Sequence, residues 1–170
     1  TSMFMHGGWF HLIGNMWFLW VFGDNVEDSM GRGRFVIFYL ICGLAAAAAQ
    51  VITGVHSLVP MVGASGAIGG VMGAYARLFP RAPVHTLVFF FFIFTTVSLP
   101  AIVMLGYWFL LQLLAGLPAL GSANSGVAFW AHVGGFLAGW FLIKPMHRPE
   151  FLMNQRRMVP VRTARHRFLS

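Results

Sequence analysis

The stretch "MVGASGAIGGVMGAYARLFP", residues 61–80, decides how the rest of the chain is interpreted. It places one serine, Ser65, between Gly63 and Gly66, at the head of a run of small residues. Small residues let membrane helices approach closely, so this serine can be a packing residue. A serine with a base in hydrogen-bond reach can instead be a nucleophile. The surrounding sequence has to separate the two interpretations.

The composition is that of a polytopic helical membrane protein. Of 170 residues, 58% are hydrophobic and 9% are charged, whereas soluble domains carry about 25% charged residues. Several apolar runs approach the roughly 20 residues that span a bilayer. We therefore expect an all-α bundle in the lipid bilayer, with five core transmembrane helices and no sizeable soluble domain.

The charged residues indicate the orientation of this bundle. All eleven basic and four acidic residues lie in three segments, residues 24–34, 77–81 and 144–167. Lys and Arg collect on the cytoplasmic side of membrane proteins. The three segments are therefore predicted to be inside and the uncharged loops outside, and the net charge of +7 is not taken as a sign of nucleic-acid binding.

The apolar runs and their breaks predict the order of the elements. Five helices are expected, over residues 9–29, 34–53, 64–77, 100–116 and 128–144. The run 84–99 is aromatic and β-branched, and a full crossing there would reverse the last helix, so we interpret it as interfacial or half-inserted. Residues 1–144 form the predicted transmembrane domain. Residues 145–170 form a basic cytoplasmic tail, lying on the inner leaflet or disordered.

Three polar side chains are predicted to lie at one depth. Ser65, His132 and Asn15 each precede the charged inner end of their helix by twelve residues, which is about 18 Å at 1.5 Å per residue. His11 lies one turn above Asn15 on the same helix face. Polar groups at membrane depth are usually functional and face a cavity. We therefore expect these four side chains to converge.

The chemistry that fits these residues is that of a serine–histidine dyad. His132 is the natural base for Ser65, although either residue alone can be explained by helix packing. The four acidic residues all lie at the inner side, so a Ser-His-Asp triad is excluded. Asn15, His11 and the backbone N–H of Ser65 can supply donors to an oxyanion, and Gly63 permits close backbone approach.

The remaining glycines predict which helices pack together. Three of them share one face of the helix over 64–77, and two more make a GxxxG pair on the helix over 128–144. Small faces of this kind bring helix backbones together. We therefore expect these two helices to be neighbours, which would bring Ser65 close to His132.

Four motifs resemble those of the rhomboid intramembrane serine proteases. They are "HGGWFHLIGN" (6–15), "VEDSMGRGR" (26–34), "GASG" (63–66) and "AHVGGFLAG" (131–139). The resemblance implies a six-helix core with a water-filled cavity open to the extracytoplasmic side of a membrane, expected to be a bacterial plasma membrane. It implies cleavage of transmembrane protein substrates near small, helix-destabilising residues, with no cofactor and no metal.

Carried over by position, the resemblance makes Ser65 the nucleophile and His132 the general base. Asn15, His11 and the Ser65 amide resemble the family's oxyanion hole, and Gly63 belongs to its serine motif. His6 resembles a member of a water-facing hydrogen-bond network.

The sequence departs from the family pattern in two places. The helix that precedes residue 9 in the family is absent, so we expect an N-terminally truncated core. Gly69 stands where many members carry an aromatic residue that packs on the catalytic histidine, so His132 is either held less firmly or held by another side chain, which the sequence does not identify. Two alternatives stay open: an inactive rhomboid-like protein that binds transmembrane helices, and a haem or metal protein that uses the histidines.

Overall fold

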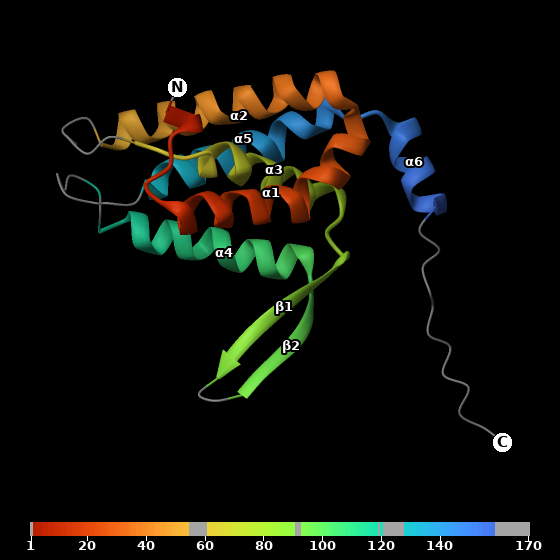
Figure 1. The fold of residues 1–170 in the computed structure, drawn as a ribbon. Coiled ribbons are helices and arrows are strands. Elements are labelled where there is room, and N and C mark those ends of the chain that lie inside the picture. The colour runs from red at the N-terminus through yellow and green to blue at the C-terminus, as the bar shows by residue number, and fades with distance from the viewer. Residues whose placement is uncertain (1, 55–60, 91–92, 119, 121–127, 159–170) are drawn as a thin grey trace.

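The computed structural model describes residues 2–54, 61–90, 93–118, 120 and 128–158. Most of the two outer loops predicted over residues 54–63 and 117–127, and the tail from 159 onward, lie outside the described residues. The elements, labelled in Figure 1, are η1 (Ser2–Phe4), α1 (Trp9–Met30), α2 (Arg32–Thr53), α3 (Ser65–Leu78), β1 (Pro83–Phe90), β2 (Ile93–Pro100), α4 (Ala101–Gly116), α5 (Phe129–Met146) and α6 (Pro149–Met158).

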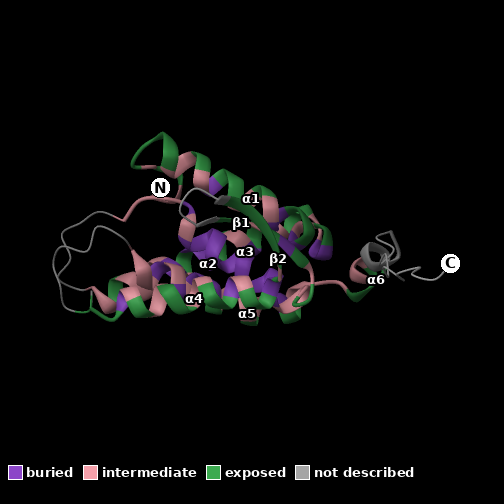
Figure 2. Cartoon of the chain, turned by 90° about the horizontal axis from the view of Figure 1, so that it is seen from below, coloured by how far each residue is buried: buried purple, intermediate pink, exposed green. Residues whose placement is uncertain are grey.

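Helix α3 forms the centre of the bundle, and the other long helices surround it. Every residue of α3 from Gly66 to Ala76 is buried. Figure 2 shows the buried residues gathered on α3, with exposed residues on the outward faces of α1 and α4. The helical bundle predicted from the composition is confirmed. Its central helix is the one that begins at Ser65.

Glycines bring the backbones of α3 and α5 into direct contact. A Cβ atom added to Gly135 would overlap the backbone carbonyl of Gly66, and one added to Gly139 would overlap that of Gly70. No residue with a side chain fits at either position of α5 without moving the helices apart. The predicted pairing of these two helices is therefore confirmed.

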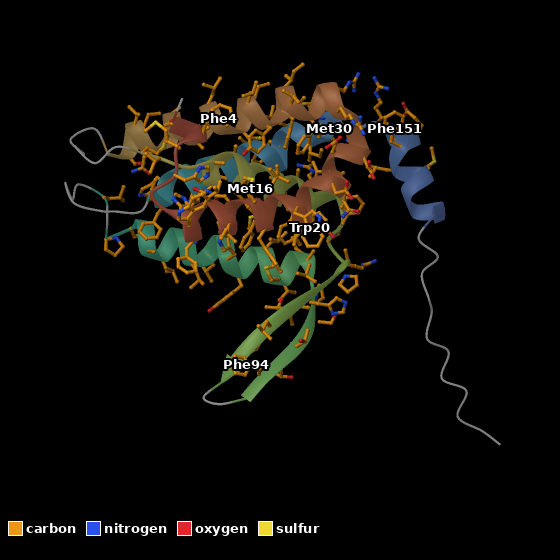
Figure 3. The ribbon with its side chains drawn as sticks, in the orientation of Figure 1. Phe4, Met16, Trp20, Met30, Phe94 and Phe151 are labelled. Carbon is orange, nitrogen blue, oxygen red and sulfur yellow. The ribbon has the colours of Figure 1, made fainter. Side chains whose placement is uncertain are left out.

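The segment between α3 and α4, interpreted from the sequence as an interfacial or half-inserted stretch over residues 84–99, forms a β-hairpin, and its strands were not predicted. Strands β1 and β2 pair antiparallel, with Pro83 opposite Pro100. β-Branched and aromatic residues favour strands, and proline is tolerated at the ends of strands. The hairpin projects from the bundle beyond α4 (Figure 1) and carries Phe94, 70% exposed, away from it (Figure 3).

The charged segments meet at one end of the bundle. The α1–α2 turn passes through Gly31, whose positive φ of 85° favours glycine. Arg34 donates from Nη1 to the carbonyl of Met146 at 3.2 Å, and the N–H of Arg148 donates to the carbonyl of Ser29 at 2.8 Å. The predicted collection of charge at one end is thus confirmed.

The first part of the basic tail is helical. Helix α5 continues two residues beyond Lys144 and is followed by α6. Phe151 of α6 lies beside the α1–α2 turn (Figure 3), 3.6 Å from the Cβ position that Gly31 lacks. The first part of the tail therefore packs onto the charged end of the bundle.

The outer surface of the bundle is strongly apolar. Phe10 is 92% exposed, Trp9 79% and Ile52 75%. Helix α2 has 22 residues, and its most apolar window has a mean hydropathy of 2.3 with only 22% of it buried. Among the described helices, α2 is the one that by length and composition could cross a bilayer. An apolar exterior of this extent fits lipid as the surrounding solvent.

Candidate active site

Ser65 and His132 are hydrogen-bonded to each other. The distance from Ser65 Oγ to His132 Nε2 is 2.8 Å. Ser65 is the first residue of α3, and His132 lies in the first turn of α5. The two helix ends meet because the glycine contacts below them bring the backbones together. The structure thus joins the two residues that the depth argument paired.

The second ring nitrogen of His132 also has a partner. Its Nδ1 lies 2.8 Å from Oε1 of Gln112, on α4. Gln112 was not among the site residues predicted from the sequence. The sequence did contain a sign of its place in the membrane. Gln112 follows Pro100, where its helix was predicted to begin, by twelve residues, and so shares the depth predicted for the other polar side chains. The partners that the structure gives the His132 ring are therefore a hydroxyl and an amide, not a carboxylate.

An aromatic residue does pack on His132, but it comes from α4. The ring centroids of Trp108 and His132 are 5.8 Å apart, and the planes are tilted by 42°. A Cβ added to Gly69 would lie 3.7 Å from Cη2 of Trp108 and 3.1 Å from the carbonyl oxygen of His132. Because Gly69 has no side chain, the indole of Trp108 can extend close to this position. The sequence left open what holds His132 in the absence of an aromatic side chain at Gly69, and in the structure Trp108 packs against its ring.

Gly63, His11 and Asn15 form a cluster just before α3. Gly63 has a positive φ of 116°. A Cβ placed on it would come within 2.8 Å of His11 Nε2 and 3.6 Å of Asn15 Nδ2. Both the backbone conformation and the space therefore require glycine here. His11 and Asn15 share one face of α1, as predicted, and both approach Gly63, two residues before Ser65.

Two side chains of this cluster, together with the backbone N–H of Ser65, can offer hydrogen-bond donors. The N–H of Gly7 donates to His11 Nδ1 at 3.3 Å, so a neutral His11 carries its hydrogen on Nε2, the atom nearest Gly63. Asn15 is 7% exposed, and its Nδ2 is buried without a partner in the described part of the chain. The backbone N–H of Ser65 is one of the free donors at the start of α3.

The comparisons with known proteins decide the family. A family model described as the Rhomboid domain matches residues 1–149. This chain belongs to the rhomboid family. Rhomboid proteins are integral membrane proteins, so the apolar exterior of the bundle faces lipid. Many members are serine intramembrane proteases.

Three relatives illustrate the match. The chain is 33% identical to "Rhomboid protease GluP" of Bacillus subtilis (strain 168) over 152 residues, covering 88% of this chain and 26% of that protein. It is 29% identical to "Rhomboid protein 1, mitochondrial" of Saccharomyces cerevisiae, covering 86% and 42%. It is 34% identical over 84 residues to "Presenilin-associated rhomboid-like protein, mitochondrial" of Mus musculus, covering 47% and 22%.

The rhomboid relatives are longer proteins than this chain. The chain spans 26% of the Bacillus protein and 42% of the yeast protein. No solved structure gives a significant match.

His6 lies at the edge of this rhomboid site. Its ring centroid is 5.3 Å from that of His11, in an edge-on arrangement. Its Nε2 is buried and has no hydrogen-bond partner among the described residues. The contact that the structure shows for His6 is therefore with His11.

A small pocket opens beside Ser65, on the side of α2. Apart from Ser65, its lining is apolar and mostly small. The lining residues are Met3, Gly43, Ala46, Met61, Val62, Gly63, Ser65, Gly66, Ala67, Ala128 and Ala131. In the described part of the chain, no group of three or more His, Cys, Asp or Glu side chains is placed to hold a metal ion.

Proposed function

We propose that this rhomboid chain is an intramembrane serine endopeptidase that hydrolyses peptide bonds in or near transmembrane segments of membrane proteins. The observation that carries the proposal is the 2.8 Å hydrogen bond between Ser65 Oγ and His132 Nε2. It lies in a membrane bundle near Asn15, whose Nδ2 is buried without a partner among the described residues. A hydroxyl bonded to an imidazole is the arrangement that activates serine for nucleophilic attack.

The reaction has two halves. Ser65 Oγ attacks the scissile carbonyl carbon while its proton moves to His132 Nε2. The tetrahedral intermediate collapses as the C–N bond breaks, and the leaving amine takes that proton. Water then attacks the acyl ester on Ser65, with His132 accepting its proton and returning it to Ser65 Oγ. The serine is regenerated and the second product leaves as a carboxylic acid.

The oxyanion formed in each half needs donors. Asn15 Nδ2, His11 Nε2–H and the Ser65 backbone N–H are assigned this role. In the part of the chain that the structure describes, Asn15 Nδ2 is buried without a partner, so it needs no reorganisation to bind the developing charge. Removing one oxyanion donor from a serine protease typically costs about 10²–10³ in kcat. His6, next to His11, is assigned to the hydrogen-bond network through which water reaches the site.

The substrate class follows from the surroundings of Ser65. The pocket beside it has a lining of alanine, glycine and methionine for the most part, which suits a small apolar side chain. A peptide bond in a helix is protected by its own hydrogen bonds. Substrates are therefore transmembrane proteins whose helix is easily unwound by small residues near the cleavage site.

The proposed setting is the plasma membrane of a bacterium, with the charged end of the bundle inside. The clustering of basic residues at the end formed by Arg34 and Arg148 supports this orientation. The Ser65 end then faces the extracytoplasmic side. Residues 1–144 are the protease domain, and residues 145–170 are a basic cytoplasmic tail.

The test is cleavage of a reporter transmembrane substrate by the purified protein in liposomes. We expect Ser65→Ala and His132→Ala to reduce cleavage by at least about 10³-fold, since serine and base act as a unit. The exposed hairpin variants Ser98→Ala and His85→Ala are matched controls and should retain activity. A wild-type protein that binds the substrate without cutting it, under conditions where a known protease cuts, would favour the inactive rhomboid-like alternative.

A further inference from the structure

We infer that Gln112 of α4 is the positioning residue that fixes the tautomer and ring orientation of His132. The inference rests on the proposed serine-protease function. Its basis is the 2.8 Å contact between Gln112 Oε1 and His132 Nδ1, on the side of the ring opposite Ser65. Ser65, His132 and Gln112 thus form a continuous chain of hydrogen bonds from α3 through α5 to α4.

The tautomer decides whether His132 can act as a base. A neutral imidazole carries its hydrogen on one nitrogen, and the other nitrogen accepts. To take the proton of Ser65, Nε2 must be the acceptor, so the hydrogen must be on Nδ1. An amide oxygen facing Nδ1 binds that hydrogen and selects this tautomer. In Ser-His-Asp triads a buried carboxylate holds the histidine in the same way.

The amide oxygen also stabilises the charged ring during the reaction. When Nε2 has taken the proton, both ring nitrogens are donors and the ring is positive. Gln112 Oε1 then accepts a charge-assisted hydrogen bond, which is stronger than the neutral one. Unlike a carboxylate, it does so without placing a full negative charge in the membrane, where an ionised side chain is costly.

The rest of α4 indicates that Gln112 is present for this contact. The helix reads "AIVMLGYWFLLQLLAG", and Gln112 is its one amide side chain. Placing an amide in an apolar membrane helix costs free energy unless it is hydrogen-bonded. Its neighbours Leu111 and Leu110 are exposed on the outer face, whereas Gln112 is half-buried and turned to His132.

Trp108 completes the arrangement from one turn earlier on the same helix. Residues four apart lie on one helix face, so Trp108 and Gln112 both face α5. Trp108 packs against the His132 ring at 5.8 Å and against Phe136, one turn further along α5, at 6.1 Å. The indole restricts the tilt of the imidazole, and the amide restricts its rotation.

The experiment compares cleavage kinetics of the full chain in liposomes for three α4 variants. Gln112→Met keeps the length of the side chain but loses the amide. Gln112→Glu keeps an oxygen acceptor at the same distance. Leu111→Met is the control for a similar change on the exposed face. Each variant is measured for kcat, KM and the thermal unfolding midpoint.

We expect Gln112→Met to lower kcat about 10- to 100-fold, the equivalent of one hydrogen bond to a charged group. KM and the unfolding midpoint should stay near wild type. Gln112→Glu should restore most of the kcat, and Leu111→Met should match wild type. A wild-type kcat for Gln112→Met overturns the inference. The inference is also overturned if kcat and the unfolding midpoint both fall in Gln112→Met and in Gln112→Glu, since that pattern indicates a purely structural role.

A spectroscopic readout separates this inference from the proposed function. The ¹⁵N chemical shifts of His132 report which ring nitrogen carries the hydrogen. We expect Nδ1 to be protonated in the wild type, and a mixture of tautomers in Gln112→Met. If Ser65→Ala proves as active as wild type, the proposed function fails, but the ¹⁵N shifts of His132 still test its contact with Gln112. A His132 protonated on Nε2 in the wild type overturns the inference, even in an active protease.

Discussion

Helices α3 and α4 hold α5 in different ways. Against α3, α5 makes backbone contact through glycines, with Gly139 facing the carbonyl of Gly70, and α3 is buried continuously from Gly66 to Ala76. Against α4, the contact is made by side chains such as Phe109 on Phe136, with ring centroids 4.7 Å apart. Only three residues of α4 are buried.

The difference indicates a division of roles. A backbone contact fixes how far apart two helices are, because it cannot adjust without moving a helix. Side-chain contacts instead fix how a particular ring is oriented, and can be lost one at a time. The α3–α5 contact therefore sets the distance between Ser65 and His132, and the α4–α5 contact sets the orientation of His132.

The largest effect is expected at the backbone contact. Gly139→Ala adds one Cβ where the carbonyl of Gly70 already lies, so the helices must separate. We expect a destabilisation of about 3 kcal/mol, at the upper end of ordinary overpacking, together with loss of cleavage. The measurement is the thermal unfolding midpoint in detergent.

The matched control for this substitution is Gly106→Ala on α4. Nothing lies within 4 Å of the Cβ that Gly106 lacks, so the same change there should be neutral or slightly stabilising. Equal behaviour of the Gly139 and Gly106 variants would contradict the proposed role of the α3–α5 contact.

A large effect on rate alone is expected at Asn15, which lies outside both contacts with α5. Asn15→Ala removes one proposed oxyanion donor and should lower kcat about 10²-fold. KM and the unfolding midpoint should change little, since Nδ2 makes no hydrogen bond in the described part of the protein. Steady-state cleavage kinetics test this, with the exposed Ile13→Ala on the same helix as control. A loss of stability without a loss of kcat would remove Asn15 from the mechanism.

A smaller effect is expected at the aromatic contact. Trp108→Leu removes the ring that packs on His132, and aromatic pairs contribute about 0.5–1.5 kcal/mol beyond area burial. That corresponds to a fall in kcat of up to about 10-fold. Trp17→Leu, at a side chain 62% exposed, is the control. If the two variants have the same cleavage rate, α4 does not orient the histidine through Trp108.

The smallest effect is expected at α2, the third helix that contacts α5. Gln50 Oε1 accepts from the N–H of Ala131 at 3.2 Å. This N–H, in the first turn of α5, also donates to the carbonyl of Ala128 at 3.1 Å, so Gln50 adds a second acceptor there. Gln50→Leu should cost about 1 kcal/mol of stability, seen as a lower unfolding midpoint, with cleavage largely kept. The exposed Val51→Leu is the control, and a midpoint equal to that of the control would show that this cap is dispensable.

The sequence predicted the parts of the molecule that depend on chain spacing. Ser65 and His132 were predicted to lie at the same depth because each is twelve residues from the charged end of its helix, and the rise per residue of a helix is constant. The spacing of glycines anticipated the α3–α5 contact. His11 and Asn15 share a face because they are one turn apart, and both approach Gly63.

The parts that depend on which helix faces which were not predicted. Nothing local to Gln112 shows that it meets His132, because that contact joins residues from two helices at an angle set by packing. The same holds for Trp108, which supplies from α4 the aromatic group that Gly69 does not. The hairpin was missed because an aromatic, β-branched run beside a membrane suits either an interfacial segment or a pair of strands.

The most direct test of the central claim is covalent labelling of the wild-type protein by a fluorophosphonate probe, with the modified residue located by peptide mass spectrometry. A serine activated by histidine attacks such a probe, whereas a packing serine does not. We predict a single adduct on Ser65, absent from Ser65→Ala and strongly reduced in His132→Ala. Labelling of Ser65→Ala as strong as that of wild type, or an adduct on another residue, would contradict the account.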